Sequence, residues 1–282
     1  MSETLVSLWT DVRRRLEAAG VDTPVLDARL LLEAGAGVAR LDIVTDPRRA
    51  VTAEQIAAVD VLVRRREARE PVSHILGRKA FWTLDLIVTP DVLTPRPETE
   101  LLVEEALRAL PADRPARVLD LGVGSGAILL AVLHERPLAR GVGVDLSEAA
   151  LVIAEANARA LGKRDRLELR RGVWTEAVEG EFDVVVSNPP YIPTGDIDGL
   201  APEVAHYEPR LALDGGADGL FAYRSIFAGL DRVLAPGGTY AVEVGAGQAP
   251  AVVELAVGMG LSAAVRADLA GVPRVIHGGR AA

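Results

Sequence analysis

The chain has 282 residues, a formal net charge of −9 and a pI of about 5.1. It contains no cysteine, which excludes disulfide bonds and thiolate metal sites, and its four histidines lack the spacing of metal ligands. The acidic balance argues against a broadly basic nucleic-acid-binding surface. The N-terminus lacks the order of a signal peptide, and the aliphatic runs fall far short of the roughly 18 residues of a membrane span, so a cytoplasmic protein without membrane contact is expected.

The first 70 residues or so have the pattern of a small helical domain. Apolar residues three and four positions apart predict helices over residues 3–19, 24–34 and 52–69. Thr52 and Gln55 have the spacing of a capping box at the start of the third helix. The triplet 64–66, three arginines near its end, is interpreted as a solvated helix terminus that complements the helix dipole, in preference to a binding patch. We therefore predict a helical domain over residues 1–75 that serves substrate recognition.

Residues 76–94 are predicted to link this domain to the next one. The β-prone stretch 80–93 contains a turn signal at Pro90-Asp91, which predicts a hairpin. The following segment, residues 94–100, is rigid and charged and leads into a helix over about 98–110. This arm reads equally as a capped linker or as a wall that lines a pocket.

From residue 117 onward, short apolar strands alternate with amphipathic helices. The predicted strands are 117–121, 141–145, 166–169, 182–186, 238–244, 261–266 and 274–277. The predicted helices between them are 125–135, 147–161, 218–235 and 247–258. Such alternation predicts a mostly parallel α/β sheet with helices on both faces, in a domain over residues 95–282.

A glycine-rich turn follows the first of these strands. Its residues are Gly122, Val123, Gly124, Ser125 and Gly126, and a helix begins directly after them. Glycines allow the tight turn and the close approach of a ligand to the backbone. The next strand ends at Asp145, whose carboxylate can accept hydrogen bonds from both ribose hydroxyls of an adenosine.

Two kinds of cofactor compete for this turn. Dinucleotide sites usually have the spacing G-x-G-x-x-G, whereas here the third glycine comes one position earlier. Asp120, directly before the turn, suits a ligand with an amine and a positive centre, which favours S-adenosylmethionine over a nicotinamide cofactor. Trp174 follows the third strand, where it can stack on an adenine or pack in the interior.

The tetrapeptide Asn188-Pro189-Pro190-Tyr191 follows the apolar strand 182–186. In open α/β sheets, ligands bind at this end of the strands. The two prolines have no N–H and fix two φ angles, so the segment offers carbonyl acceptors, the Asn188 side-chain oxygen and an aromatic face at Tyr191. Such a row of acceptors suits a planar NH2 group. We therefore predict catalytic roles for Asn188, Pro189 and Tyr191.

These motifs together resemble the HemK/PrmC family of protein-(glutamine-N5) methyltransferases. The resemblance runs from about residue 70 to near the C-terminus. The segments that carry it are Glu70-Pro71-Val72-Ser73-His74-Ile75-Leu76-Gly77, Phe81-Trp82, Pro95-Arg96-Pro97-Glu98-Thr99-Glu100, Asp120-Leu121-Gly122, residues 187–192 and Tyr207-Glu208-Pro209-Arg210. Two positions depart from the family pattern: Val123 replaces a small hydroxyl residue, and Val173 replaces an acidic residue.

The resemblance implies a class I S-adenosylmethionine-dependent methyltransferase with a Rossmann-like, seven-stranded sheet. It implies S-adenosylmethionine as cofactor, S-adenosylhomocysteine as product, and as substrate the glutamine of the Gly-Gly-Gln loop in bacterial peptide chain release factors. The donor site it implies comprises Gly122, Val123, Gly124, Ser125, Gly126, Asp145, Trp174 and Asn188. The substrate site it implies comprises Asn188, Pro189, Pro190 and Tyr191.

Other functions share parts of this pattern. Adenine methyltransferases that act on DNA or RNA also have Asn-Pro-Pro-Tyr, and methyltransferases of a ribosomal-protein glutamine are related, although they differ at the arm. A binding module without turnover is a third alternative. The acidic pI disfavours nucleic acid as a partner, and a monomer is the default expectation.

Overall fold

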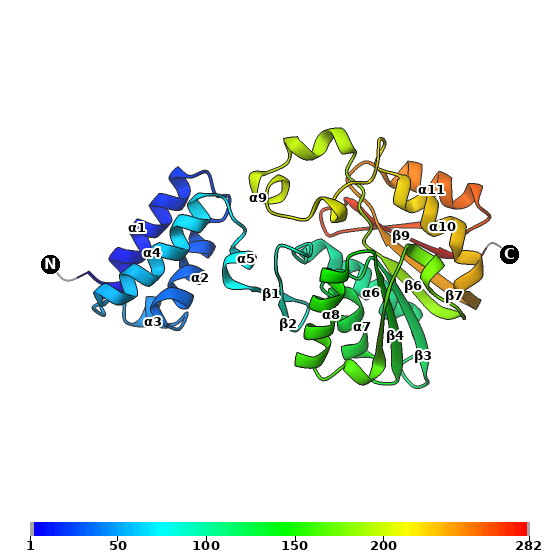
Figure 1. Cartoon of the computed structure of the whole chain (residues 1–282), viewed down its shortest axis with the longest axis horizontal. Coiled ribbons are helices and arrows are strands. Elements are labelled where there is room, and N and C mark those ends of the chain that lie inside the picture. The colour runs from blue at the N-terminus through cyan, green and yellow to red at the C-terminus, as the bar shows by residue number, and fades with distance from the viewer. Residues whose placement is uncertain (1–2, 281–282) are drawn as a thin grey trace. The chain divides into compact units, whose positions relative to one another are not determined.

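The computed structural model describes residues 3–280. The chain forms two compact units, Met1–Gly77 with Ala201–Tyr207, and Arg78–Leu200 with Glu208–Ala282. Figure 1 shows the helices of the first unit and the sheet of the second. No helix within residues 3–280 is long and apolar enough to cross a membrane.

The first unit is built from short helices around an apolar core. They are α1 (Leu5–Ala18), α2 (Pro24–Ala36), α3 (Asp42–Thr45), α4 (Ala53–Glu67), α5 (Val72–Leu76) and α9 (Pro202–Ala205). The predicted capping box at Thr52 is confirmed, because its hydroxyl accepts the Gln55 N–H at 3.2 Å and its own N–H reaches the Gln55 side chain at 3.0 Å. Leucine and valine side chains of α1, α2 and α4 fill the core between the helices.

The predicted solvated helix terminus is wrong for Arg66. Its side chain is buried, and its guanidinium lies 2.7 Å from the Asp27 carboxylate and 2.9 Å from that of Glu203. Arg69 also pairs with Glu203, at 2.7 Å. The segment around α9 is therefore held in the first unit by charge-assisted hydrogen bonds, although it is distant in sequence.

The hairpin that opens the second unit turns at a different place from the predicted one. Strand β1 (Arg78–Phe81) pairs with β2 (Leu84–Ile87) in antiparallel register, with Phe81 opposite Leu84. The turn is therefore Trp82-Thr83, and Trp82 has a φ of 55°. Pro90-Asp91 forms a separate turn after the hairpin.

The second unit contains a seven-stranded sheet in the order β5-β4-β3-β6-β7-β9-β8 (Figure 1). The strands are β3 (Ala116–Leu121), β4 (Ala139–Asp145), β5 (Leu167–Arg171), β6 (Phe182–Ser187), β7 (Leu234–Glu243), β8 (Ala264–Ala267) and β9 (Pro273–Gly279). All neighbours pair in parallel except β9, which is antiparallel to β7 and to β8. The predicted mostly parallel sheet is confirmed.

Helices cover both faces of this sheet. On one face, the core includes side chains from α6 (Glu100–Ala109), α7 (Ala127–Glu135) and α8 (Glu148–Ala160). On the other face, it includes side chains from α10 (Phe221–Val233) and α11 (Ala249–Gly258). The short 3₁₀ helix η1 (Pro97–Thr99) leads into α6. Because β3, β4 and β6 are parallel, their carboxyl ends meet at one edge, where side chains from distant segments come together.

Candidate active site

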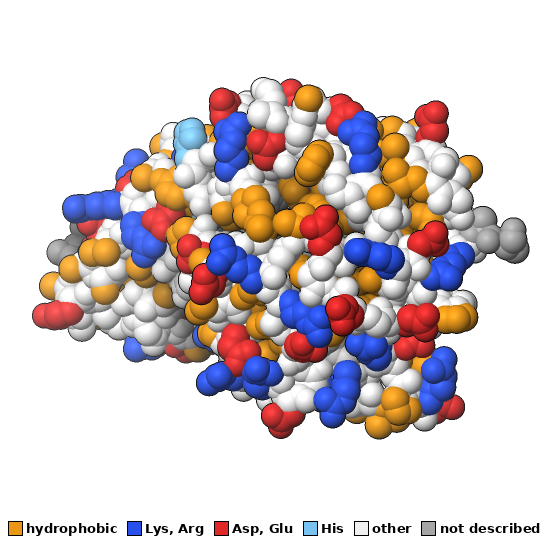
Figure 2. All heavy atoms as spheres, turned by 45° about the vertical axis from the view of Figure 1, so that its right-hand side comes forward, with side chains coloured by type: hydrophobic (Ala, Val, Ile, Leu, Met, Phe, Trp, Pro, Cys, Tyr) orange, Lys and Arg blue, Asp and Glu red, His pale blue; other side chains and the backbone are white. Residues whose placement is uncertain are grey.

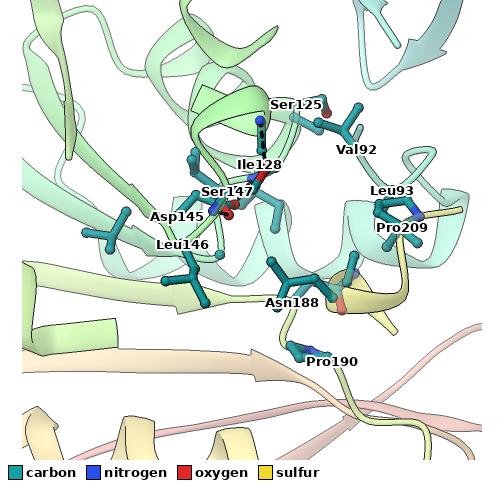
Figure 3. A pocket seen from close by; sticks show the side chains of 18 of the residues that line it. Val92, Leu93, Ser125, Ile128, Asp145, Leu146, Ser147, Asn188, Pro190 and Pro209 are labelled. Atoms are coloured by element: carbon teal, nitrogen blue, oxygen red, sulfur yellow. Dashed lines mark hydrogen bonds between the residues drawn. The ribbon is translucent and has the colours of Figure 1, made fainter. Parts of the chain in front are cut away.

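A cavity of about 300 Å³ opens at the carboxyl ends of these strands. Figure 3 shows Asp145, Leu146 and Ser147 on one side of it, Leu93 and Pro209 on another, and Asn188 and Pro190 below. Most of the surface that lines it is apolar, with a few polar groups. This composition is typical of sites for small molecules.

The glycine turn between β3 and α7 forms one wall. Gly122, Gly124 and Gly126 have φ angles of 78°, 53° and 83°, a region that favours glycine. A Cβ on Gly124 would meet only a backbone oxygen at 4.0 Å, so the backbone is open to a ligand there, whereas a Cβ on Gly126 would lie 2.9 Å from Leu130. Of the predicted turn residues, Gly122, Val123, Gly124 and Ser125 line the cavity and Gly126 does not.

Asp145 ends strand β4 and lines the cavity beside the turn. Its Oδ2 accepts the Gly124 N–H and its Oδ1 accepts the Ser147 N–H, each at 2.9 Å. Burial raises the pKa of Asp145, and these backbone hydrogen bonds oppose the rise. Each carboxylate oxygen keeps a further lone pair for a ligand hydroxyl.

Asp120 does not face the cavity, contrary to the expectation for a ligand amine. Its side chain is fully buried and has no hydrogen-bond partner among residues 3–280. Burial, with a contribution from Asp145, raises the pKa of Asp120 to about 8. It therefore lies beneath the turn, where burial favours its protonated form.

Trp174 and Val173 lie on the cavity wall after β5. Trp174 has a φ of 44°. Because it lines the cavity and also packs against the core, the two predicted roles, contact with the ligand and packing in the interior, are compatible. The Val173 side chain is 43% exposed and lines the cavity, where it offers an apolar surface instead of an acceptor.

The segment after β6 forms the floor of the cavity. Asn188 and Pro190 line it, whereas Pro189 and Tyr191 do not. The Tyr191 ring lies against the backbone beyond β7, since a Cβ on Gly245 would be 3.0 Å from its Cδ2. Burial raises the pKa of Tyr191 to about 12, and its carbonyl accepts the Gln248 Nε2–H at 2.8 Å.

The charged arm lies beside this floor and lines the cavity with Pro95, Arg96 and Thr99. The Arg96 guanidinium is 2.8 Å from the buried Glu208 carboxylate, which also accepts the Thr94 N–H at 3.3 Å. Thr99 accepts a hydrogen bond from Asn188 Nδ2 at 3.2 Å. The arm is therefore a wall of the pocket, as one of its two readings predicted.

Sequence reasoning missed several residues that form the site. Leu93, Leu146, Leu211 and Phe221 line the cavity without any local pattern that marks them, and Pro209 lines it within a family segment to which no role was assigned. Glu243 ends strand β7 and is buried behind Asn188; burial raises its pKa to about 7. The sequence signal that could have identified Glu243 is an acidic residue at the end of an apolar strand.

Within the described part of the chain, no group of three or more His, Cys, Asp or Glu side chains could hold a metal ion.

The sheet order, the glycine turn and the strand-end carboxylate together define a class I S-adenosylmethionine-dependent methyltransferase. Models of the PrmC N-terminal domain and of the methyltransferase small domain match residues 7–77 and 97–203. The chain is 56% and 48% identical to two release factor glutamine methyltransferases over most of its length, and it belongs to that family.

Two relatives show the extent of this similarity. The chain is 56% identical over 253 residues to the release factor glutamine methyltransferase of Caulobacter vibrioides, covering 89% of this chain and 88% of the relative. It is 48% identical to that of Rhodospirillum rubrum, covering 93% and 81%. The fold is also that of a methyltransferase from Pyrococcus furiosus, with a TM-score of 0.53 at 18% identity, covering 72% of this chain and 92% of the other.

Proposed function

We propose that this protein transfers a methyl group from S-adenosylmethionine to the side-chain amide nitrogen of the glutamine in the Gly-Gly-Gln loop of bacterial peptide chain release factors. The observation that carries the proposal is the position of Asn188 at the floor of the cavity, across from the glycine turn and Asp145. The names of the relatives support the substrate. The proposed methyl transfer takes place in the cytoplasm, where release factors act.

The donor is assigned to the upper part of the cavity. Asp145 would accept hydrogen bonds from the ribose hydroxyls, and the open backbone at Gly122 and Gly124 would approach the rest of the donor. Leu146 and Val173 would cover the base with apolar surface. When bound, S-adenosylmethionine supplies an electrophilic methyl group on a positively charged sulfur.

The substrate amide is assigned to the floor. Its nitrogen is a weak nucleophile because the lone pair is delocalised into the carbonyl. In the proposed arrangement, the Asn188 side-chain oxygen at the cavity floor accepts one of its two N–H groups and holds the nitrogen towards the methyl group. The proposed acceptor of the second N–H is the Pro189 carbonyl, although Pro189 is buried and does not line the cavity. Such positioning accounts for up to about 7–11 kcal/mol of a barrier in favourable intramolecular cases.

The proposed reaction needs no strong base before the methyl group is transferred. The nitrogen lone pair forms the new N–C bond while the S–C bond electrons return to sulfur, which leaves S-adenosylhomocysteine. The nitrogen becomes acidic once it is methylated, and water or a carbonyl relay takes its proton. Tyr191, with its pKa raised to about 12, remains a neutral phenol throughout. We assign it a packing role behind the floor.

Replacing Asp145 by alanine is expected to weaken donor binding by about 1.5–3 kcal/mol, the range for a hydrogen bond to a charged group. Titration calorimetry with S-adenosylhomocysteine measures this change. Exposed Asp196, in the 3₁₀ helix η4 (Thr194–Gly199) after the floor, provides a matched control as Asp196→Ala. Equal affinities for the wild type and Asp145→Ala would remove Asp145 from the ribose site.

Methyl transfer from labelled donor to a purified bacterial release factor tests the substrate, with duplex DNA and ribosomal proteins in parallel. We expect one methyl group on the Gly-Gly-Gln glutamine, located by mass spectrometry, and none on the other substrates. Label on DNA adenine or on a ribosomal protein would assign the chain to one of the two alternative activities. Absence of label from every substrate would contradict the proposed reaction.

We further propose that the protein acts as a monomer and does not bind nucleic acid. On the face shown in Figure 2, basic and acidic side chains are interspersed. The net charge of −9 also opposes binding to phosphates. Binding to DNA that weakens steeply with salt would contradict this proposal.

A further inference from the structure

The amide of Asn188 lies between two buried side chains from other elements. Strands β6 and β7 are parallel neighbours in which Ser187 lies opposite Val242. Asn188, which follows β6, and Glu243, the last residue of β7, therefore lie at the same edge of the sheet. Thr99, the last residue of η1 in the charged arm, reaches the same point.

The hydrogen bonds at this point determine how the amide is oriented. Asn188 Nδ2 donates to Thr99 Oγ1 at 3.2 Å. The Glu243 carboxylate lies close enough to Thr99 and to Asn188 for both side chains to lower its pKa, against the rise that burial causes. Asn188 Nδ2 donates to Thr99, so the NH2 group faces Thr99, with the buried Glu243 carboxylate, which only accepts when ionised, beside it. The one oxygen of the amide is then left to face the cavity.

We propose that Glu243, together with Thr99, is a positioning residue that holds Asn188 with its side-chain oxygen towards the substrate amide. The inference rests on the proposed function, in which that oxygen accepts a substrate N–H. If the amide were rotated by 180°, its NH2 group would face the substrate NH2 group, and two hydrogen-bond donors cannot bond to each other. Glu243 does not line the cavity, so it acts through Asn188 and touches neither substrate nor donor.

The surroundings of Glu243 support this role. Its side chain is only 3% exposed, and Oε2 has no hydrogen-bond partner within residues 3–280, an arrangement that stability alone does not favour. Burial raises the pKa of Glu243 to about 7, while the hydrogen bond from Thr99 opposes the rise. The charged or titratable groups that face it are Glu98, Arg274, Tyr191 and Tyr223. The protonated form keeps a carbonyl oxygen as acceptor, so the positioning does not require the charge.

This role also explains the threonine in the arm. Thr99 is 4% exposed, and its hydroxyl accepts from Asn188. A hydroxyl has one donor and two acceptor positions, so the Thr99 donor stays available for Glu243, whose pKa the Thr99 side chain lowers. The arm therefore lines the pocket and, through Thr99, also connects the floor to strand β7.

Glu243→Met removes the acceptor at similar volume, and Glu243→Gln keeps one acceptor oxygen. With release factor as substrate, we expect Glu243→Met to lower kcat by roughly 10- to 100-fold, the scale of a slightly misplaced reacting group. Glu243→Gln should stay within about threefold of the wild type, and donor affinity should stay within about twofold in both variants. In an Asn188→Ala background, Glu243→Met should have almost no further effect, because residues that act through one another are not additive.

A second measurement does not depend on turnover. The chain has only two asparagines, Asn157 and Asn188, so ¹⁵N labelling of asparagine side chains yields two NH2 signals. Asn157 Nδ2 donates to the carbonyls of Ile87 and Ser125, at 3.0 and 2.9 Å, and is an internal reference. In Glu243→Met, the Asn188 NH2 protons should exchange faster with water, while those of Asn157 should be unchanged.

The outcomes separate the two proposals. Unchanged exchange at Asn188 in Glu243→Met overturns the positioning role, whatever the substrate is. An equal loss of kcat with and without Asn188 also overturns it, because Glu243 would then act by another route. If the wild type does not methylate release factor, the proposed function fails, and the exchange measurement still decides whether Glu243 orients Asn188.

Discussion

Asn188→Ala is expected to lower turnover by about 100- to 1,000-fold, the range seen when one preorganised hydrogen-bonding group is removed from an active site. The variant loses the acceptor that holds the substrate amide, while the turn and Asp145 keep their contacts to each other. Donor binding should therefore weaken by less than about tenfold. Single-turnover kinetics with labelled donor, together with calorimetric titration of the donor, measure the two effects separately.

The control for this variant is Asp196→Ala, an exposed position in the 3₁₀ helix η4 that follows the floor. Its turnover should remain within about twofold of the wild type, since surface substitutions have small effects. A collapse of donor affinity in Asn188→Ala, with unchanged turnover of the bound donor, would make Asn188 a donor-binding residue only.

Arg66→Met is expected to destabilise the first unit by about 3–5 kcal/mol, the cost of removing one partner of a buried ion pair. Asp27 is 1% exposed and would lose its cation, keeping only the Thr23 hydroxyl at 3.0 Å. Glu203 would retain Arg69. Urea denaturation followed by circular dichroism and by the fluorescence of Trp9, in α1, measures the free energy of unfolding of this unit.

Arg64→Met is the matched control on the same helix. The Arg64 side chain is 75% exposed and pairs with Asp60 at 2.6 Å, so the loss should be within about 1 kcal/mol, as for surface ion pairs. Adding Asp27→Asn to Arg66→Met should recover part of the stability, because no buried charge then lacks its cation. Equal losses in Arg64→Met and Arg66→Met would contradict the importance of burial.

Local patterns were sufficient where the physical cause is local. The strands and helices of the sheet follow from runs of apolar residues, and the capping box at Thr52 and Gln55 requires only residues of one turn. The glycine turn was visible because its backbone geometry restricts the residue type. The hairpin was misplaced because Trp82, at a positive φ, carries no turn signal, whereas Pro90-Asp91 carries a strong one.

The sequence by itself determined the class of fold, the glycine turn and the place of Asn188 at the end of a strand, because each depends on neighbouring residues. Only the tertiary structure decided that Arg66 is buried between Asp27 and Glu203, and that Asp120 lies beneath the turn instead of facing the cavity. It also decided that Thr99 and Glu243 meet at Asn188. These partners are far apart along the chain, and folding brings them together because parallel strands end at one edge of the sheet.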